Sequence, residues 1–367
     1  MSESRTHAKT KWIRLIAGNI LVFVLILLLL EGGSSYLLVL FNSLMARPVA
    51  ERLHTQYDPE LGWVNKPNIN MPNMYGQGIS LKTNSQRFRA DHDFDVAVPH
   101  GKYRAICSGD SFTLGYGVSD DHAWCQLLTK LDPQLETVNM GQAGYGLDQT
   151  YLWYKRDGLK FEHQIHLLAF ITEDFKRMQS DKYIGYSKPF LDIENGSLVV
   201  RNVPVPRRAY QAPWLTTTIE QLEHLRTIEF LNRLSLRLRE SSGNSDEISL
   251  KDKIRKTREI VSKILEDLKR QDDAQSRRLV MVYLPLKSEM KGDDPQEWIK
   301  FLKTESKALG IPLINVLESF RNLPDGEAEE MFIPEGQLGY RGAAGHLNNQ
   351  GNQLVADIIY KSLREEK

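Results

Sequence analysis

The chain has 367 residues, of which 41% are hydrophobic, so it is long enough to bury a substantial core as one large domain with insertions or as two smaller domains. Its 47 Lys and Arg residues balance 47 Asp and Glu residues, which gives a formal net charge of +0. This balance argues against a nucleic-acid partner, because nucleic-acid-binding domains carry a basic surface.

The N-terminal region predicts a membrane anchor. Four Lys or Arg residues and one acid in the first fourteen positions precede the uncharged run LIAGNILVFVLILLLL (Leu15–Leu30), and a second apolar patch follows at Tyr36–Phe41. About twenty apolar residues span a bilayer. We therefore expect a cytoplasmic tail at 1–12, an uncleaved single-pass anchor at 13–41, and an extracytoplasmic remainder, periplasmic or extracellular. A cleaved signal peptide and a core helix of a soluble protein are the alternatives.

Residues 42–98 are rich in Pro and Asn and read as an irregular, membrane-proximal cap of short strands and turns. Strand and helix patterns then alternate over 99–367, which is typical of a parallel sheet covered by helices on both faces. We predict a three-layer α/β/α fold with a five-stranded parallel sheet. The expected strands are Tyr103–Cys107, Glu136–Met140, His166–Thr172, Leu279–Leu284 and Leu313–Val316. The expected helices are Ala123–Lys130, Leu147–Gly158, Leu250–Gln271, Pro295–Leu309 and Gln350–Arg364.

An insertion at 175–249 interrupts this alternation. Lys188–Pro206 reads as a hairpin that turns at Asn195-Gly196, because Asn-Gly favours tight turns, and Ala212–Glu240 reads as an amphipathic helix. The only two cysteines, Cys107 and Cys125, are expected to be buried free thiols in a strand and a helix. No metal site and no cofactor are indicated.

Four segments carry candidate catalytic groups. SGDSF follows the first expected strand and carries Ser111; NMGQAGYG follows the second and carries Gly144; ITEDF ends the third and carries Glu173; and GHLNNQG precedes the last helix and carries His346. Three of them lie at the carboxyl ends of strands, where open α/β sheets place their sites. A hydroxyl, an imidazole and glycine N–H groups gathered there are the components of an acyl-transfer site. The alternative is a purely structural role, in which the GDS turn only caps a helix.

These four blocks, in this order, resemble the SGNH superfamily of hydrolases, also called GDSL-type esterases, which has a flavodoxin-like fold. LGWVNKPN and TNSQRFRADHDF are similar to the lead-in of membrane-anchored bacterial members. The resemblance implies that Ser111 is the nucleophile, that His346 is the general base, and that the N–H groups of Ser111 and Gly144 bind the oxyanion.

The chain departs from the family pattern at two positions. Glu173 stands where the family has an asparagine that donates to the oxyanion; it could serve if protonated, or the Thr172 hydroxyl could replace it. Ala343 stands where the family has the acid that orients the histidine; a backbone carbonyl, or an acid of the preceding loop such as Glu335 or Asp325, is the candidate replacement. Other polar residues are expected on the surface: His163, His166, Asp120, Asp121, His122, Arg177 and Lys182. The alternatives are a metal-ligand role for the two histidines, a place at the mouth of the site for residues 120–122, and contact of Arg177 and Lys182 with an anionic substrate.

The resemblance implies a serine esterase or acyl hydrolase. The expected substrate is an ester or an acylated carbohydrate, such as the O-acetyl groups of envelope or secreted polysaccharide. The alternatives are a polysaccharide O-acetyltransferase, served by a membrane acyl-donor partner, and a degenerate, non-catalytic SGNH scaffold that binds glycan or protein.

Overall fold

The structure, a computed structural model, describes residues 12, 15–16, 18–30, 32–34, 36, 54–184, 186–207, 245–290, 292, 295–324 and 326–365. The chain divides into two units, one made of Met1–Val49 with Ala209–Glu247 and the other of Ala50–Arg208 with Ile248–Lys367. The predicted helix at 212–240 and the candidate triad residue Asp325 lie outside the described residues.

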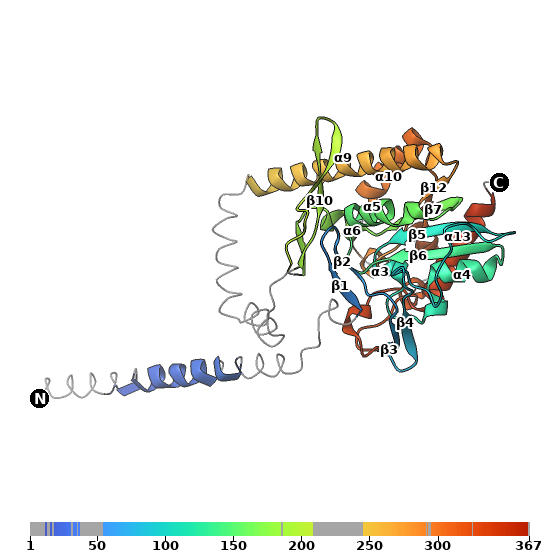
Figure 1. The fold of residues 1–367 in the computed structure, drawn as a ribbon. Coiled ribbons are helices and arrows are strands. Elements are labelled where there is room, and N and C mark those ends of the chain that lie inside the picture. Colours follow the sequence, from blue (N-terminus) through green and yellow to red (C-terminus); the bar gives the residue numbers. More distant parts are fainter. Residues whose placement is uncertain are drawn as a thin grey trace, which may run out of the picture. The chain divides into compact units, whose positions relative to one another are not determined.

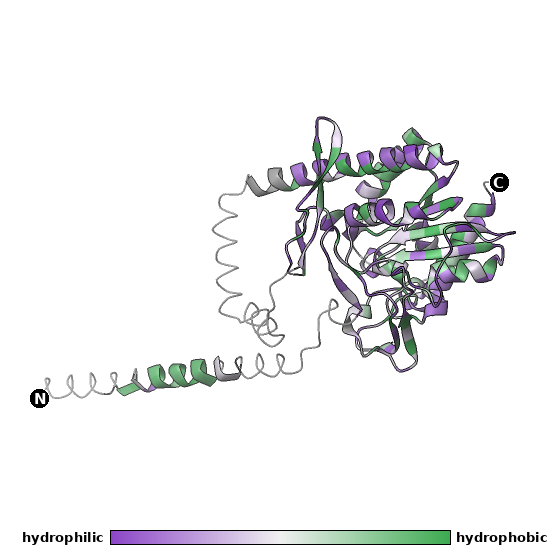
Figure 2. Ribbon diagram, in the orientation of Figure 1, coloured by the Kyte–Doolittle hydropathy of each residue, from purple (hydrophilic) through white to green (hydrophobic). Residues whose placement is uncertain are grey.

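In the first unit, the described residues between 12 and 36 are helical, and those from 18 to 30 are almost all apolar and exposed (Figure 2). Within the described residues, no helix combines the length and the apolar character that crossing a membrane requires. Part of the predicted anchor at 13–41 falls outside those residues, so the anchor stays a prediction.

The second unit is built around a five-stranded parallel sheet, as predicted (Figure 1). Its order is β13-β12-β7-β5-β6, which is the doubly wound order 2-1-3-4-5 when the strands are numbered along the chain. In this order the connections leave opposite faces of the sheet after β5 and β7, which creates a crevice at their carboxyl ends. The strands are β5 (Tyr103–Gly109), β6 (Leu135–Gly141), β7 (Ile165–Phe170), β12 (Arg278–Tyr283) and β13 (Leu313–Asn315).

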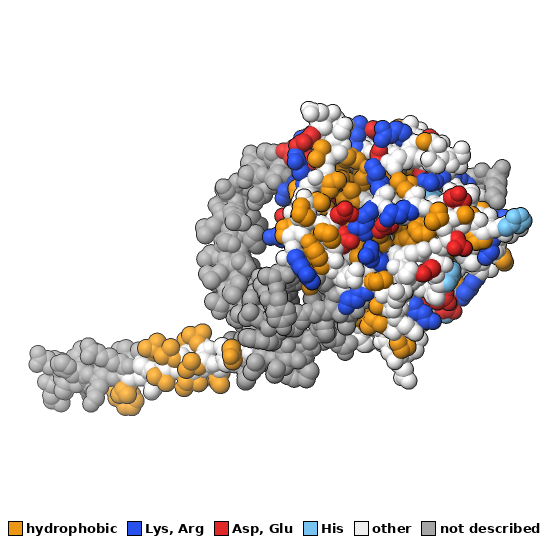
Figure 3. Space-filling model, in the orientation of Figure 1, with side chains coloured by type: hydrophobic (Ala, Val, Ile, Leu, Met, Phe, Trp, Pro, Cys, Tyr) orange, Lys and Arg blue, Asp and Glu red, His pale blue; other side chains and the backbone are white. Residues whose placement is uncertain are grey.

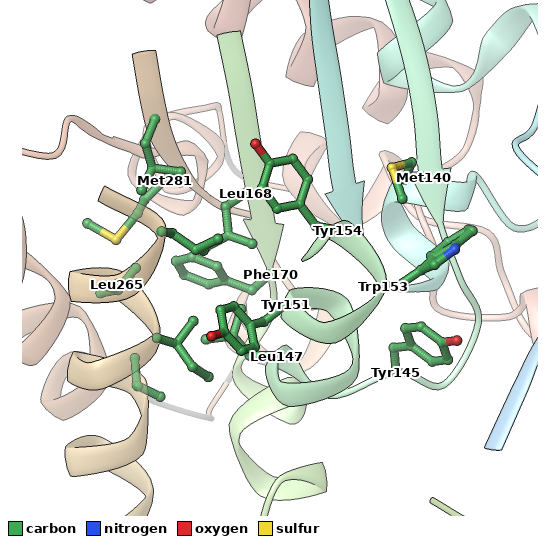
Figure 4. Packing of buried hydrophobic residues seen from close by; sticks show 14 of the residues in the cluster. Met140, Tyr145, Leu147, Tyr151, Trp153, Tyr154, Leu168, Phe170, Leu265 and Met281 are labelled. Carbon is green, nitrogen blue, oxygen red and sulfur yellow. The ribbon is translucent and has the colours of Figure 1, made fainter. Parts of the chain in front are cut away.

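Helices cover both faces of the sheet. Alternating strand residues point to opposite sides, so that Leu168 packs with one layer of helices and Leu167 with the other. Figure 4 shows the first layer, where Tyr154 and Phe170 pack between helix and sheet. That layer contains α5 (Leu147–Arg156), α9 (Ser245–Ala274) and α10 (Gln296–Leu309); the second contains α4 (Trp124–Leu131), α11 (Val316–Arg321) and α13 (Asn349–Glu365).

Short two-stranded sheets surround this framework. Before the main sheet, β1 (Thr55–Asp58) pairs with β2 (Gly62–Asn65), and β3 (Asn70–Gly76) pairs with β4 (Ile79–Lys82). Within the insertion, β8 (Lys182–Tyr183) pairs with β9 (Tyr186–Ser187), and β10 (Phe190–Glu194) pairs with β11 (Ser197–Arg201). The last hairpin turns at Asn195 and Gly196, both with positive φ, as the Asn-Gly pair predicts.

Charged side chains of both signs are intermixed on the face shown in Figure 3, in keeping with the balanced composition. Cys107 and Cys125 are buried free thiols, as predicted. The remaining short helices are α3 (Ser111–Leu114), α6 (Thr172–Arg177) and α12 (Glu327–Glu330).

Candidate active site

Ser111 lies at the carboxyl end of β5, as the first residue of the short helix α3. The helix is capped by Asp110, whose Oδ1 accepts a 2.8 Å hydrogen bond from the Phe112 N–H. Because Asp110 caps the helix, the Ser111 hydroxyl is not needed for that purpose. Ser111 is only 6% exposed. The GDS turn therefore contains both a helix cap and a separate, buried hydroxyl.

The Ser111 hydroxyl meets His346. Ser111 Oγ lies 2.8 Å from His346 Nε2, although the two residues are 235 positions apart in the chain. The His346 ring packs against Phe112, with ring centroids 4.6 Å apart, and against Tyr116, at 5.3 Å. Burial lowers the pKa of His346 to about 4, and Asp110 opposes this shift. The imidazole is therefore neutral near neutral pH and able to accept a proton.

Among the described residues, the other nitrogen of His346 has no side-chain partner, although the backbone of Ala343 and Ala344 opposes the lowering of its pKa. His346 Nδ1 is buried and makes no hydrogen bond within the described residues. Ala343 is completely buried and has no acid to offer, and Glu335 is exposed with no hydrogen bond to the ring among the described contacts. Ser111 and His346 thus form a dyad in the part of the chain that the structure describes.

The two backbone N–H groups expected at the oxyanion belong to Ser111 itself and to Gly144, which follows β6. In the described part of the chain, the N–H groups of Ser111 and Gly144 donate to no backbone or side-chain acceptor. Gly144 has φ +76°, and a Cβ built on it would lie 2.6 Å from the Tyr183 ring. Only glycine combines this backbone conformation with such a close neighbour. These features fit the oxyanion role expected for both N–H groups.

Glycine also lets the site's turns pack closely. A Cβ on Gly141, at the end of β6, would lie 2.0 Å from the backbone nitrogen of Leu114 in α3. The absence of a side chain at Gly141 therefore allows α3, which begins with Ser111, to pack directly against the end of β6.

Glu173 does not join the dyad. Its side chain is 41% exposed, and its Oε1 accepts a 2.6 Å hydrogen bond from Lys176, three residues later on α6. The Thr172 hydroxyl is bound to Tyr283 and to the buried Glu289. Both side chains proposed from the sequence as substitutes for the family asparagine have other partners.

Arg177 was expected on a solvated face, and this expectation is wrong. Its side chain is 12% exposed, and Nη1 donates to Asp110 Oδ2 at 3.1 Å, to Asp174 Oδ1 at 2.6 Å and to the Tyr145 carbonyl at 2.8 Å. The reason is that two buried carboxylates require a nearby cation. Asp174 lies three positions earlier on α6, but Asp110 is 67 positions away, and the sequence gives no sign that folding brings it to this helix.

Arg89, in the lead-in, fixes the loop that follows α3. Its guanidinium is fully buried and donates to the carbonyls of Leu114, Gly115 and Val118, and to Asp120 at 3.0 Å. Asp120 is therefore a structural partner, not a solvated loop residue. Arg89 belongs to the segment TNSQRFRADHDF, but nothing in the sequence alone shows which loop this arginine binds.

A second Ser–His pair lies inside the domain. Ser108 Oγ is 2.7 Å from His166 Nε2, and His166 Nδ1 is 3.2 Å from Asp272 Oδ2. Ser108 is 1% exposed, and His166 and Asp272 are completely buried. The prediction that His163 and His166 are surface residues is wrong, because both are buried with hydrogen-bond partners. Ser108 lies within β5, three residues before Ser111, and its partner is His166 rather than His346.

No protein-family model matches the chain, and no curated protein matches it either. Among solved structures, the chain is similar to an acetyl xylan esterase, with 13% identity and a TM-score of 0.41 over 71% of this chain and 99% of the other. It is similar to the lipase/acylhydrolase from Enterococcus faecalis, with 14% identity and a TM-score of 0.35 over 72% and 96%. A GDSL-like lipase from Bacteroides thetaiotaomicron matches with 11% identity and a TM-score of 0.39 over 75% and 93%. At this level of similarity, the chemistry of the site follows from the arrangement of its own residues and not from these proteins.

Proposed function

We propose that the protein is a serine esterase of the SGNH type that uses Ser111 as nucleophile and His346 as general base. The observation that carries the proposal is the 2.8 Å contact between Ser111 Oγ and His346 Nε2 at the carboxyl end of strand β5. A hydroxyl and a neutral imidazole at this distance are suited to proton transfer during attack on a carbonyl.

In the proposed reaction, Ser111 Oγ attacks the carbonyl carbon of an ester while His346 Nε2 takes the hydroxyl proton. The N–H groups of Ser111 and Gly144 donate to the resulting oxyanion. The ester C–O bond then breaks, and the alcohol leaves with the proton from His346. Water, activated by His346, releases the acid from the acyl-serine.

The proposed substrate is an O-acetyl ester of envelope or secreted polysaccharide, and the proposed location is extracytoplasmic, held by an anchor at 13–41. The apolar run Leu15–Leu30 supports this location. Transfer of the acyl group to a sugar hydroxyl instead of water would make the protein an O-acetyltransferase, with a membrane partner as acyl donor. Acetyl release with and without an added sugar acceptor distinguishes the two.

One observation favours a second candidate, a non-catalytic scaffold: His346 Nδ1 has no partner within the described residues. Hydrolysis of p-nitrophenyl acetate by the purified full chain separates the candidates. An esterase is expected to lose activity on the order of 10⁴-fold or more in Ser111→Ala and His346→Ala. Wild-type protein with no more activity than these variants would contradict the proposal and favour the scaffold.

A further inference from the structure

Arg177 joins three of the segments that build the site. It lies at the end of α6, after β7, and its Nη1 reaches Asp110, next to Ser111, and the carbonyl of Tyr145, next to Gly144. The same nitrogen also binds Asp174 on its own helix. A single guanidinium therefore connects the turn of the nucleophile with the turn of the second oxyanion donor.

The charge at this position matters for the proposed reaction. Ser111 Oγ lies 3.4 Å from Asp110 Oδ2, and the Asp110 side chain is only 1% exposed. Negative charge that develops on the substrate beside Ser111 is repelled by a buried carboxylate, because burial weakens solvent screening. A cation on Asp110 removes that repulsion.

Arg177 is the cation bound to Asp110 among the described contacts. Arg177 Nη1 also lies 2.6 Å from Asp174 Oδ1, and burial, followed by the Asp110 carboxylate, raises the pKa of Asp174 well above its ordinary value. Where Asp174 is protonated, Arg177 and Asp110 remain as a one-to-one ion pair. Lys176, on the same helix, is engaged with Glu173.

We propose that Arg177 is a positioning residue for ester cleavage: it neutralises Asp110 and fixes the turns that carry Ser111 and Gly144. The inference rests on the proposed esterase function. The helix that carries Glu173 at the surface also carries Arg177, four residues later, against the buried Asp110. Arg177 acts through Asp110 and the Tyr145 carbonyl, not by contact with the reacting atoms.

The test is the rate of fluorophosphonate labelling of the purified full chain as a function of pH. Arg177→Met is expected to slow labelling on the order of 10²-fold, the range for loss of one preorganised electrostatic group. It is also expected to shift the acid limb of the pH–rate profile, which is the fall in labelling rate as His346 becomes protonated, to higher pH. The charged groups that affect His346 are Asp110 and Arg177, with the Phe112 and Tyr116 rings packed on the imidazole. Without Arg177, the Asp110 carboxylate is no longer neutralised. It then stabilises the protonated His346 ring and raises the pKa of His346.

A charge-balanced variant separates this role from packing. Adding Asp110→Asn to Arg177→Met removes the unpaired carboxylate, and we expect about tenfold recovery of the labelling rate with an acid limb near the wild-type position. Arg104→Met is the matched control: Arg104 is also fully buried and paired with an acid, Glu136, but it lies near the opposite end of β5. This control is expected to lower thermal stability and to leave the acid limb unchanged.

The possible failures are distinct. Wild-type protein that is folded but not labelled would overturn both the esterase function and this inference. Labelled wild type with Arg177→Met within about twofold of its rate, or a double variant slower than Arg177→Met, would overturn the inference alone. If Arg177→Met fails to fold, the charge-retaining Arg177→Lys is compared with wild type. An acid limb that stays in place in this variant supports the inference, and one that moves up overturns it.

Discussion

His346 accepts or donates at only one of its two ring nitrogens: Nε2 lies 2.8 Å from Ser111 Oγ, whereas Nδ1 is buried without a hydrogen-bond partner in the described part of the chain. The tautomer that accepts the Ser111 proton carries its own proton on Nδ1. Within the described residues that proton meets no hydrogen-bond acceptor of good geometry, although the backbone of Ala343 and Ala344 raises the pKa of His346, and the ring packs against Phe112 and Tyr116.

An acid placed near Nδ1 is expected to speed the reaction. Ala343 precedes His346 in the same turn, where its carbonyl accepts the His346 N–H at 3.1 Å. We expect Ala343→Asp to raise kcat for p-nitrophenyl acetate about tenfold, a modest part of the roughly 10⁴-fold effect of a triad acid. The acid limb of kcat/KM should also move to higher pH, since a carboxylate stabilises the imidazolium. Ala343→Asn is the uncharged control, and a gain of equal size in both variants would contradict the explanation.

The pH dependence of the wild type follows from the burial of His346. Its pKa is lowered to about 4, so the neutral base persists well below the pH at which an exposed histidine becomes protonated. We expect kcat/KM to stay level from about pH 7 to about pH 5 and to fall by about tenfold per pH unit below pH 4. Short assays that precede any unfolding measure this limb. An acid limb centred near the ordinary histidine value of about 6.5 would show that His346 is not buried in the free enzyme.

Gly141→Ala tests the close packing beneath the nucleophile. The added Cβ would lie 2.0 Å from the Leu114 nitrogen, and a backbone atom in a packed turn cannot move aside cheaply. We expect a loss of about 1–3 kcal/mol or more in the free energy of unfolding, measured by chemical denaturation. Gly292→Ala is the control, because a Cβ there meets nothing within 4 Å. Equal stability of the two variants would refute the packing argument.

Acid pH is expected to destabilise the fold through its buried histidines. Burial lowers the pKa of His54 to about 3, and His54 Nε2 lies 2.7 Å from the Tyr116 hydroxyl. A histidine whose pKa is lower in the folded than in the unfolded state contributes full stability above about pH 6.5 and loses it as the pH falls toward 3. This histidine contributes at most about 1.4 kcal/mol per pH unit to the slope of the free energy of unfolding against pH. We expect His54→Gln to reduce the slope by that amount between about pH 6 and pH 4, as denaturant titrations at several pH values would measure. An unchanged slope would contradict a neutral, buried His54.

The sheet was predictable because strand signals are local. Each of its five strands was predicted to within two residues at either end, since each is a short apolar run bounded by a turn. The pairing of Ser111 with His346 was also anticipated, but from the resemblance of the blocks and not from their spacing.

The charged partners were not predictable, because they depend on long-range packing. Arg177 and Asp110 are 67 positions apart, and His166 and Asp272 are 106 apart. Taken alone, a charged residue in a polar stretch such as TEDFKR favours a solvated helix face. Burial of two carboxylates near the Ser111 turn reverses that expectation for Arg177, and the sequence does not display which residues are buried together.

The most direct test of the esterase assignment is to identify the serine that reacts with a fluorophosphonate. Attack by Ser111 would release fluoride and leave one phosphonyl group on the folded full chain. Intact mass and peptide mapping are expected to give a single adduct on Ser111 in the wild type and in Ser108→Ala, and none in Ser111→Ala. Ser108 provides the matched control: its Oγ lies 2.7 Å from a histidine nitrogen, compared with 2.8 Å for Ser111, but it lies within β5 and is 1% exposed, compared with 6% for Ser111. A folded wild type without an adduct, or an adduct that persists in Ser111→Ala, would contradict the assignment.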